Sequence, residues 1–137
     1  MARTHNKVRY LPKSGVRAYT PVTAARDVEQ ALKVLEGRWK LLILFHLFGG
    51  KILRFSGLER AIPAISQKML IQQLRQMEND GMVRRIVHHQ VPPKVEYALT
   101  AWGQALCPAL DALLKWAALR EETAANASSR TRNRDDL

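Results

Sequence analysis

Cysteine is nearly absent from this chain of 137 residues, which contains Cys107 alone. One thiol cannot form an internal disulfide, and it excludes the metal sites that need several cysteines. The four histidines do not stand at metal-ligand spacing with acidic partners. We therefore expect a protein without a metal ion or another cofactor.

Long apolar runs are missing as well. The longest, residues 41–48, is interrupted by His46 and stops at Gly49-Gly50, whereas a membrane-spanning helix needs about 20 apolar residues. Residues 1–21 are basic but lack the apolar stretch of a secretory signal. These absences predict a cytoplasmic protein with no membrane partner.

Acidic residues are scarce, with 12 against 22 lysines and arginines and a formal net charge of +10. Such an excess attracts polyanions, of which nucleic acid is the commonest in a cytoplasm, although a basic enzyme would show the same balance. The chain carries no Ser-His-Asp set, no carboxylate pair in a plausible cleft and no glycine-rich phosphate loop. We therefore expect a protein that is not an enzyme.

Composition divides the chain into three parts. Residues 1–22 contain no acid and are punctuated by Pro12, Gly15 and Pro21, which predicts a flexible basic arm that contacts phosphates, packs across a dimer or has no role. Residues 23–120 are expected to form one domain. Residues 121–137 lose the apolar period from Ala125 onward and are predicted to be disordered.

Hydrophobic periodicity and capping signals predict the elements of the domain. Ser56 and Glu59 have the spacing of a capping box, Ser66 and Thr100 can cap helices, and Gly81 can end one. Helices are expected over 23–35, 38–48, 56–63, 66–80 and 100–119, and strands over 82–88 and 95–99. A short helix, a turn, a second helix and a hairpin predict a mainly α fold (α+β) with a small β-hairpin wing, the winged helix-turn-helix.

The predicted helix 66–80 has two stripes on opposite sides, because successive residues turn by about 100°. Leu70, Leu74 and Met77 share the apolar side. The polar side carries Lys68, Gln72, Arg75 and Asn79. Amides can bond adenine and basic groups can bond guanine or phosphate. A solvated helix face would show the same pattern, but the neighbouring turn and hairpin favour a recognition helix that contacts double-stranded DNA.

Further DNA contacts are expected at the start of this helix and in the wing. Free N–H groups at a helix N-terminus favour phosphate, and residues 88–94 would form a wing along the backbone or in the minor groove, where positive charge is favoured. Adjacent arginines of one strand point to opposite faces, so at most one should meet DNA; His88 and His89 fit an exposed loop pair without a role equally well. These candidates are Ser66, Gln67, Arg54, Arg84, Arg85, His89 and Lys94.

Residues 28–116 resemble the HxlR-type winged helix-turn-helix regulators, which are relatives of the MarR-type repressors. The matching blocks are Gly37-Arg38-Trp39-Lys40, Arg54-Phe55-Ser56-Gly57-Leu58, Ile65-Ser66-Gln67-Lys68-Met69-Leu70, Glu78-Asn79-Asp80-Gly81 and Val91-Pro92-Pro93-Lys94-Val95-Glu96-Tyr97. The resemblance implies a bacterial, sequence-specific transcriptional repressor that binds a pseudo-palindromic operator as a homodimer. It also implies that the first and last helices form the dimer.

The last predicted helix agrees with a dimer, because it has more apolar surface than one small domain could cover. The candidate interface residues are Val28, Leu32, Trp102, Leu106, Leu110, Leu113 and Trp116. A non-specific protein that coats DNA is the alternative function, since the basic arm and the net charge fit it too.

The sequence leaves one sensing function open, the binding of a small molecule, and argues against another, the sensing of oxidants by a thiol. A small-molecule effector stays open, because Trp39, Phe45, Phe48 and Trp116 could line a cavity, although aromatic residues at helical spacing are more often plain core. Some members of the family sense oxidants through a Cys-Pro before the first helix. That place falls near Arg26 here, so thiol sensing is not expected, and Cys107 is interpreted as a small buried residue.

Overall fold

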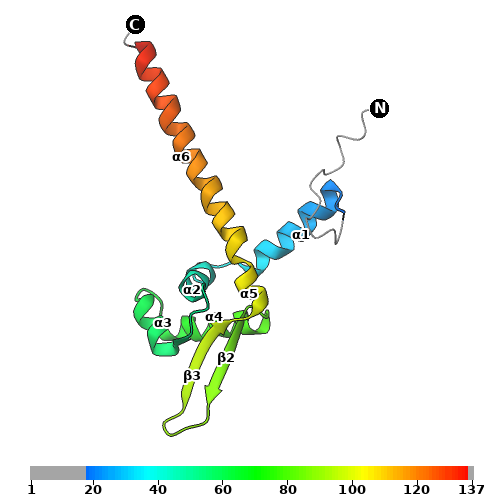
Figure 1. The fold of residues 1–137 in the computed structure, drawn as a ribbon, viewed down its shortest axis with the longest axis vertical. Helices are drawn as coiled ribbons and strands as arrows, with labels where there is room; N and C mark the ends of the chain where they lie inside the picture. Colours follow the sequence, from blue (N-terminus) through cyan, green and yellow to red (C-terminus); the bar gives the residue numbers. More distant parts are fainter. Residues whose placement is uncertain (1–17, 136–137) are drawn as a thin grey trace. The chain divides into compact units, whose positions relative to one another are not determined.

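The structure is a computed structural model that describes residues 18–135 (Figure 1). The chain divides into two compact units, residues 1–41 and residues 42–137. The elements are α1 (Pro21–Val34), α2 (Lys40–Leu47), β1 (Leu53–Arg54), α3 (Phe55–Ala61), α4 (Gln67–Asn79), β2 (Val83–His88), β3 (Lys94–Leu99), α5 (Ala101–Ala105) and α6 (Cys107–Asp135). The order of helices and hairpin confirms the predicted winged helix-turn-helix.

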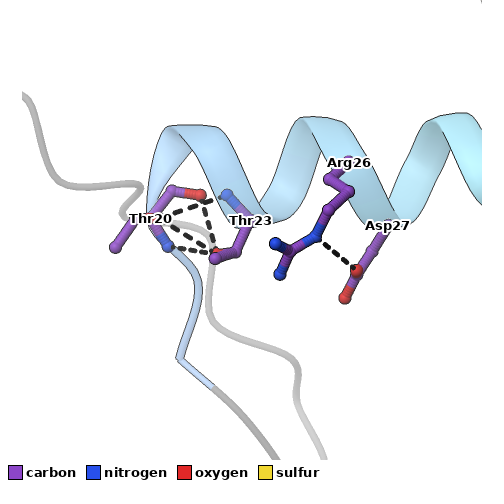
Figure 2. Close-up of polar contacts among 4 residues, drawn as sticks. All are labelled: Thr20, Thr23, Arg26 and Asp27. Atoms are coloured by element: carbon purple, nitrogen blue, oxygen red, sulfur yellow. Dashed lines mark hydrogen bonds and ion pairs between the residues drawn. The ribbon is translucent and has the colours of Figure 1, made fainter.

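Helix α1 begins at Pro21, two residues before the expected start. A capping box explains this start: the Thr20 hydroxyl accepts from the Thr23 N–H at 3.2 Å, and the Thr23 hydroxyl accepts from the Thr20 N–H at 2.9 Å (Figure 2). Proline suits the first helical position, where no N–H is needed. The last two residues of the predicted arm 1–22 are therefore helical, and residues 1–17 of that arm lie outside the described residues.

The apolar sides of α2, α3, α4 and β2 form the core of the second unit. The fully buried side chains there are Ile43, Leu44, Leu47, Leu58, Ile62, Leu70, Leu74, Met77 and Val83. The apolar stripe predicted for helix 66–80 is thereby confirmed, since all three of its members are buried. Helix α2 stops before Gly49 and Gly50, which have φ of 86° and 75° and end it as expected.

The antiparallel sheet of residues 18–135 has the order β1-β3-β2. Strands β2 and β3 pair from Val83 opposite Leu99 to His88 opposite Lys94, which confirms the predicted hairpin within one residue at each strand. In Figure 1 this hairpin extends away from α3 and α4 as a wing. Strand β1 is an addition that the sequence did not predict, because two residues are too few to show alternation.

Three predicted caps are confirmed. Ser66 Oγ accepts from the Met69 N–H at 3.1 Å and starts α4, which ends at Asp80 before Gly81, with φ of 79°. Thr100 Oγ1 accepts from the Gly103 N–H at 3.0 Å and starts α5. The predicted cap at Ser56 is wrong: α3 begins at Phe55 after Arg54, whose side chain makes no capping bond. Pairing of β1 with β3 holds Arg54 extended, so the helix starts directly behind it.

The last helix differs from the expected single helix 100–119. It is divided into α5 and α6 at Leu106, and Pro108 accounts for the break because it has no N–H to bond to the carbonyl of Gln104. Helix α6 then continues to Asp135, so residues 121–135 are helical where the sequence predicted disorder. Residues 109–135 contain neither glycine nor proline, and alanine, glutamate and arginine favour a helix.

Substitution Gly103→Ala should destabilise the protein by about 1–3 kcal/mol, because the new methyl group would overlap the backbone carbonyl of Met82. Gly57→Ala in α3 is the matched control, since its methyl group would meet Leu53 at an ordinary 3.8 Å and should be neutral or slightly stabilising. Urea unfolding of both variants measures the difference. Equal stability of the two variants would contradict the close approach at Gly103.

Candidate nucleic-acid interface

The polar stripe of α4 faces solvent as predicted. Lys68, Gln72, Arg75 and Asn79 are all exposed. They line an open groove of about 630 Å³ on the helix surface, which is formed by Gln67, Lys68, Ile71, Gln72, Arg75, Gln76 and Asn79. None of these seven side chains carries a negative charge, so the groove presents hydrogen-bonding and basic groups without the repulsion that an acid would exert on phosphate.

The start of α4 has a side-chain cap at Ser66 and backbone N–H groups that make no bond within the helix. The Ser66 hydroxyl accepts from Met69, and the first intrahelical backbone bond runs from Leu70 N to Ser66 O at 2.9 Å. The N–H groups of Gln67 and Lys68 precede that bond at the positive end of the helix dipole. Ser66 and Gln67 are exposed, so this helix end can approach a phosphate or a base edge.

A second groove, of about 540 Å³, lies between α4 and the wing. Its lining residues are Phe55, Gln67, Ile71, Leu74, Arg75, Glu78, Arg85, Val95 and Tyr97. Arg85 therefore lies on the face of the sheet that is turned toward α4, and alternation places Arg84 on the other face. The structure thus distinguishes the two adjacent arginines, which the sequence could not do.

The opposite face of the sheet contains an acidic residue that the sequence interpretation overlooked. Glu96 is paired with Arg54 of β1 and with Ile86 of β2, so these side chains share that face. Its carboxylate lies 2.6 Å from His88 Nε2 and 3.8 Å from Lys94 Nζ. The charge of Lys94 is partly compensated within the wing, whereas His89 is exposed at the wing tip.

The predicted contacts are therefore distributed over three places. The α4 stripe, Gln67 and Arg85 line the two grooves, which share Gln67, Ile71 and Arg75. Ser66 is exposed at the start of the same helix. The far face of the sheet carries Arg54, Arg84 and Lys94. His89 lies at the wing tip, apart from both groups. Ile71, which lines both grooves, was not among the predicted contacts, because an isoleucine at helical spacing is ordinarily interpreted as core.

The candidate dimer residues also differ in exposure. Leu110 is buried within the chain and needs no partner to be covered, whereas Leu106 is half-buried. Trp102, Leu113 and Trp116 are exposed by 58%, 48% and 71%, and Val28 and Leu32 of α1 are exposed as well. Cys107 is half-buried at the start of α6.

The aromatic residues considered for an effector site have different surroundings. Phe45 and Phe48 of α2 make an edge-to-face contact with ring centroids 5.4 Å apart, and Phe48 is buried in the core. Trp39 is stacked under the Arg38 guanidinium at 4.4 Å. Trp116 lines a groove on α6 together with Ala117, Leu119, Arg120, Glu121, Thr123, Ala124 and Ala127. An effector therefore stays a prediction.

A helix-turn-helix with an exposed polar second helix and a following hairpin defines a winged-helix DNA-binding domain. Comparison with known proteins agrees with this class. Residues 34–124 match the model of the HxlR-like helix-turn-helix family. The HTH-type transcriptional regulator YtcD of Bacillus subtilis (strain 168) is 54% identical over 92 residues, which are 67% of this chain and 72% of that protein.

Solved structures show the same fold. The redox regulator HypR in its reduced form is 41% identical with a TM-score of 0.64, over 73% of this chain and 98% of that one. A MarR-family transcriptional regulator from Enterococcus faecalis V583 is 38% identical with a TM-score of 0.70, over 74% of this chain and 92% of that one. The chain belongs to the HxlR-like helix-turn-helix family. It is a transcriptional regulator, and transcriptional regulators are not an enzyme class.

Among residues 18–135, no helix is both long and apolar enough to cross a membrane. The longest, α6, contains charged residues along its length, such as Asp111, Lys115 and Arg120.

Substitution Glu96→Gln should raise affinity for random-sequence duplex DNA by about two- to fivefold at low salt, because it frees Lys94 to pair with a phosphate. The salt dependence should become steeper by about one unit in slope. Fluorescence anisotropy over a salt series measures both. Glu122→Gln on α6 changes the net charge equally and serves as the control; an identical gain in the two variants would contradict a specific role of Glu96 in the wing.

Proposed function

We propose that this regulator binds a pseudo-palindromic operator as a homodimer and represses transcription there. Helix α4 enters the major groove, and the wing, residues 88–94, lies along the backbone or in the minor groove. Such a protein acts where the chromosome is, so we also propose a cytoplasmic location. The alternative, a protein that coats DNA without sequence preference, has no observation in its particular favour.

The polar stripe of α4, whose surface groove is lined by no acidic side chain, is the observation that carries this proposal. Leu70, Leu74 and Met77 fix the helix in the core, and their burial holds the opposite side in one orientation. Lys68, Gln72, Arg75 and Asn79 then offer amide and basic groups along successive helical turns. Bidentate amide and guanidinium contacts distinguish base pairs in the major groove, so an array of this kind can read a sequence.

The remaining contacts are assigned by their position around α4. Ser66 and Gln67 at the helix start suit a phosphate or a base edge. Arg85, which lines the groove between α4 and the wing, is the better-placed member of the arginine pair. We keep Arg54, Arg84, His89 and Lys94 as backbone contacts of the wing region, where basic groups position a protein without reading sequence.

Exposed apolar side chains support the homodimer. Trp102, Leu113 and Trp116 leave much of their surface uncovered in a single chain, and large exposed apolar side chains gathered on neighbouring helices suit an interface. A two-fold dimer through the terminal helices would present two copies of α4 to half-sites about 34 Å apart, which is one turn of DNA.

Substitution Arg75→Ala should weaken binding to a selected operator by about 10- to 100-fold, the value of one or two lost base contacts. The operator is first obtained by selecting bound fragments from the genome of the host. Binding to random duplex should fall much less, because one phosphate contact is all that is lost there. Gln72→Ala should show the same selectivity.

Lys51→Ala, an exposed position between α2 and β1, removes the same charge outside the interface and is the control. An equal loss on operator and on random DNA for Arg75→Ala would contradict the proposed readout and favour the coating function.

Substitution Leu113→Glu should convert the dimer into monomers, because it places a charge on the exposed apolar surface of α6. Sedimentation equilibrium at micromolar concentration measures the change. Lys115→Glu introduces the same acid at an exposed polar position of the same helix and should leave the dimer intact. A monomeric wild-type chain, or a dimer that persists in Leu113→Glu, would contradict the proposed interface.

A further inference from the structure

Ile71 occupies an unusual place on α4. Its side chain is 36% exposed, and it lines both the groove on the helix surface and the groove between α4 and the wing. Helical steps place it about 40° from Arg75 and about 60° from Lys68 around the helix axis. An apolar side chain therefore stands beside the polar stripe, inside the surface that faces DNA in the proposed complex.

The core covers only part of this isoleucine. Leu70 and Leu74, its neighbours on the inner side of α4, are 0% and 1% exposed, and they fill the interior without it. Ile71 is also a poorer helix former than leucine or alanine, since its branched Cβ loses freedom in a helix. Burial thus accounts for only part of this side chain, and helix propensity does not favour an isoleucine at this position.

We propose that Ile71 reads the C5-methyl group of a thymine in the major groove, and so selects T·A over C·G at one position of each half-site. This inference rests on the proposed function. The thymine methyl group is the apolar feature that the major groove displays, and cytosine lacks it. Contact between the methyl group and the isoleucine removes apolar surface from water on both sides, which a C·G pair cannot reproduce.

The geometry also predicts where this thymine lies. Ile71 and Arg75 are four residues apart, which is about 6 Å along the helix. Successive base pairs are about 3.4 Å apart along the duplex axis. The thymine should therefore lie within about two base pairs of the base that Arg75 contacts.

Replacing thymine by deoxyuridine tests the inference, because it removes the methyl group and leaves every base-pairing group in place. The full chain is used to select duplexes from a random-sequence library, and each thymine of the selected duplex is then replaced singly. For the wild-type protein, one position in each half-site should lose about three- to tenfold in affinity. In Ile71→Ala that position should bind thymine and deoxyuridine equally.

Two matched variants give the test its controls. Ile71→Val keeps a branched apolar side chain and should retain most of the methyl dependence. Val87→Ala removes an apolar side chain that is 38% exposed on the wing and should leave the dependence unchanged. Thermal melting of each variant confirms that it is folded before binding is measured.

The outcomes separate this inference from the function on which it rests. A selected consensus whose affinity does not depend on the methyl group, or depends on it equally in wild type and Ile71→Ala, overturns the role of Ile71 and leaves the sequence-specific regulator standing. A selection that enriches no sequence overturns both.

Discussion

The burial of one side of α4 is the constraint on which the DNA-binding surface depends. Leu70, Leu74 and Met77 are held in the core with almost no exposure, and this contact determines the rotation of the helix about its axis. A rotation by one residue would turn the polar stripe by about 100°, so the same packing that stabilises the domain also aims Gln72 and Arg75. In the proposed complex with DNA, stability and recognition are thus properties of opposite sides of one helix.

Charge is distributed less simply than the overall balance suggests. The groove on α4 carries basic groups without an acid, whereas the far face of the wing sheet holds Glu96 against His88 and Lys94. A sequence-specific regulator must dissociate readily from non-specific DNA. Its affinity for such DNA rises with every unpaired cationic side chain on its surface. In the proposed complex, the Glu96 carboxylate moderates that affinity from a face of the sheet that does not carry the proposed base contacts.

The features of the fold that are local in sequence could be predicted, and those that depend on distant pairing could not. The capping bonds at Ser66, Gly81 and Thr100 join residues at most a few positions apart, and the stripes of α4 follow from its period. The short strand β1 and the start of α3 depend on pairing with Glu96 and Tyr97, more than forty positions along the chain. The choice between Arg84 and Arg85 needed the register of the hairpin, and Pro108 as a helix break was overlooked.

The junction around Thr100 has a mechanical consequence. Its hydroxyl donates to the carbonyl of Gly81 at 2.6 Å, its N–H donates to Met82 O at 3.0 Å, and Gly103 lies against that same carbonyl. One residue thus joins the end of α4, the base of the wing and the beginning of the helices that follow. These contacts tie the three segments together at one point, so a shift of α5 would displace the base of the wing and the end of α4 together.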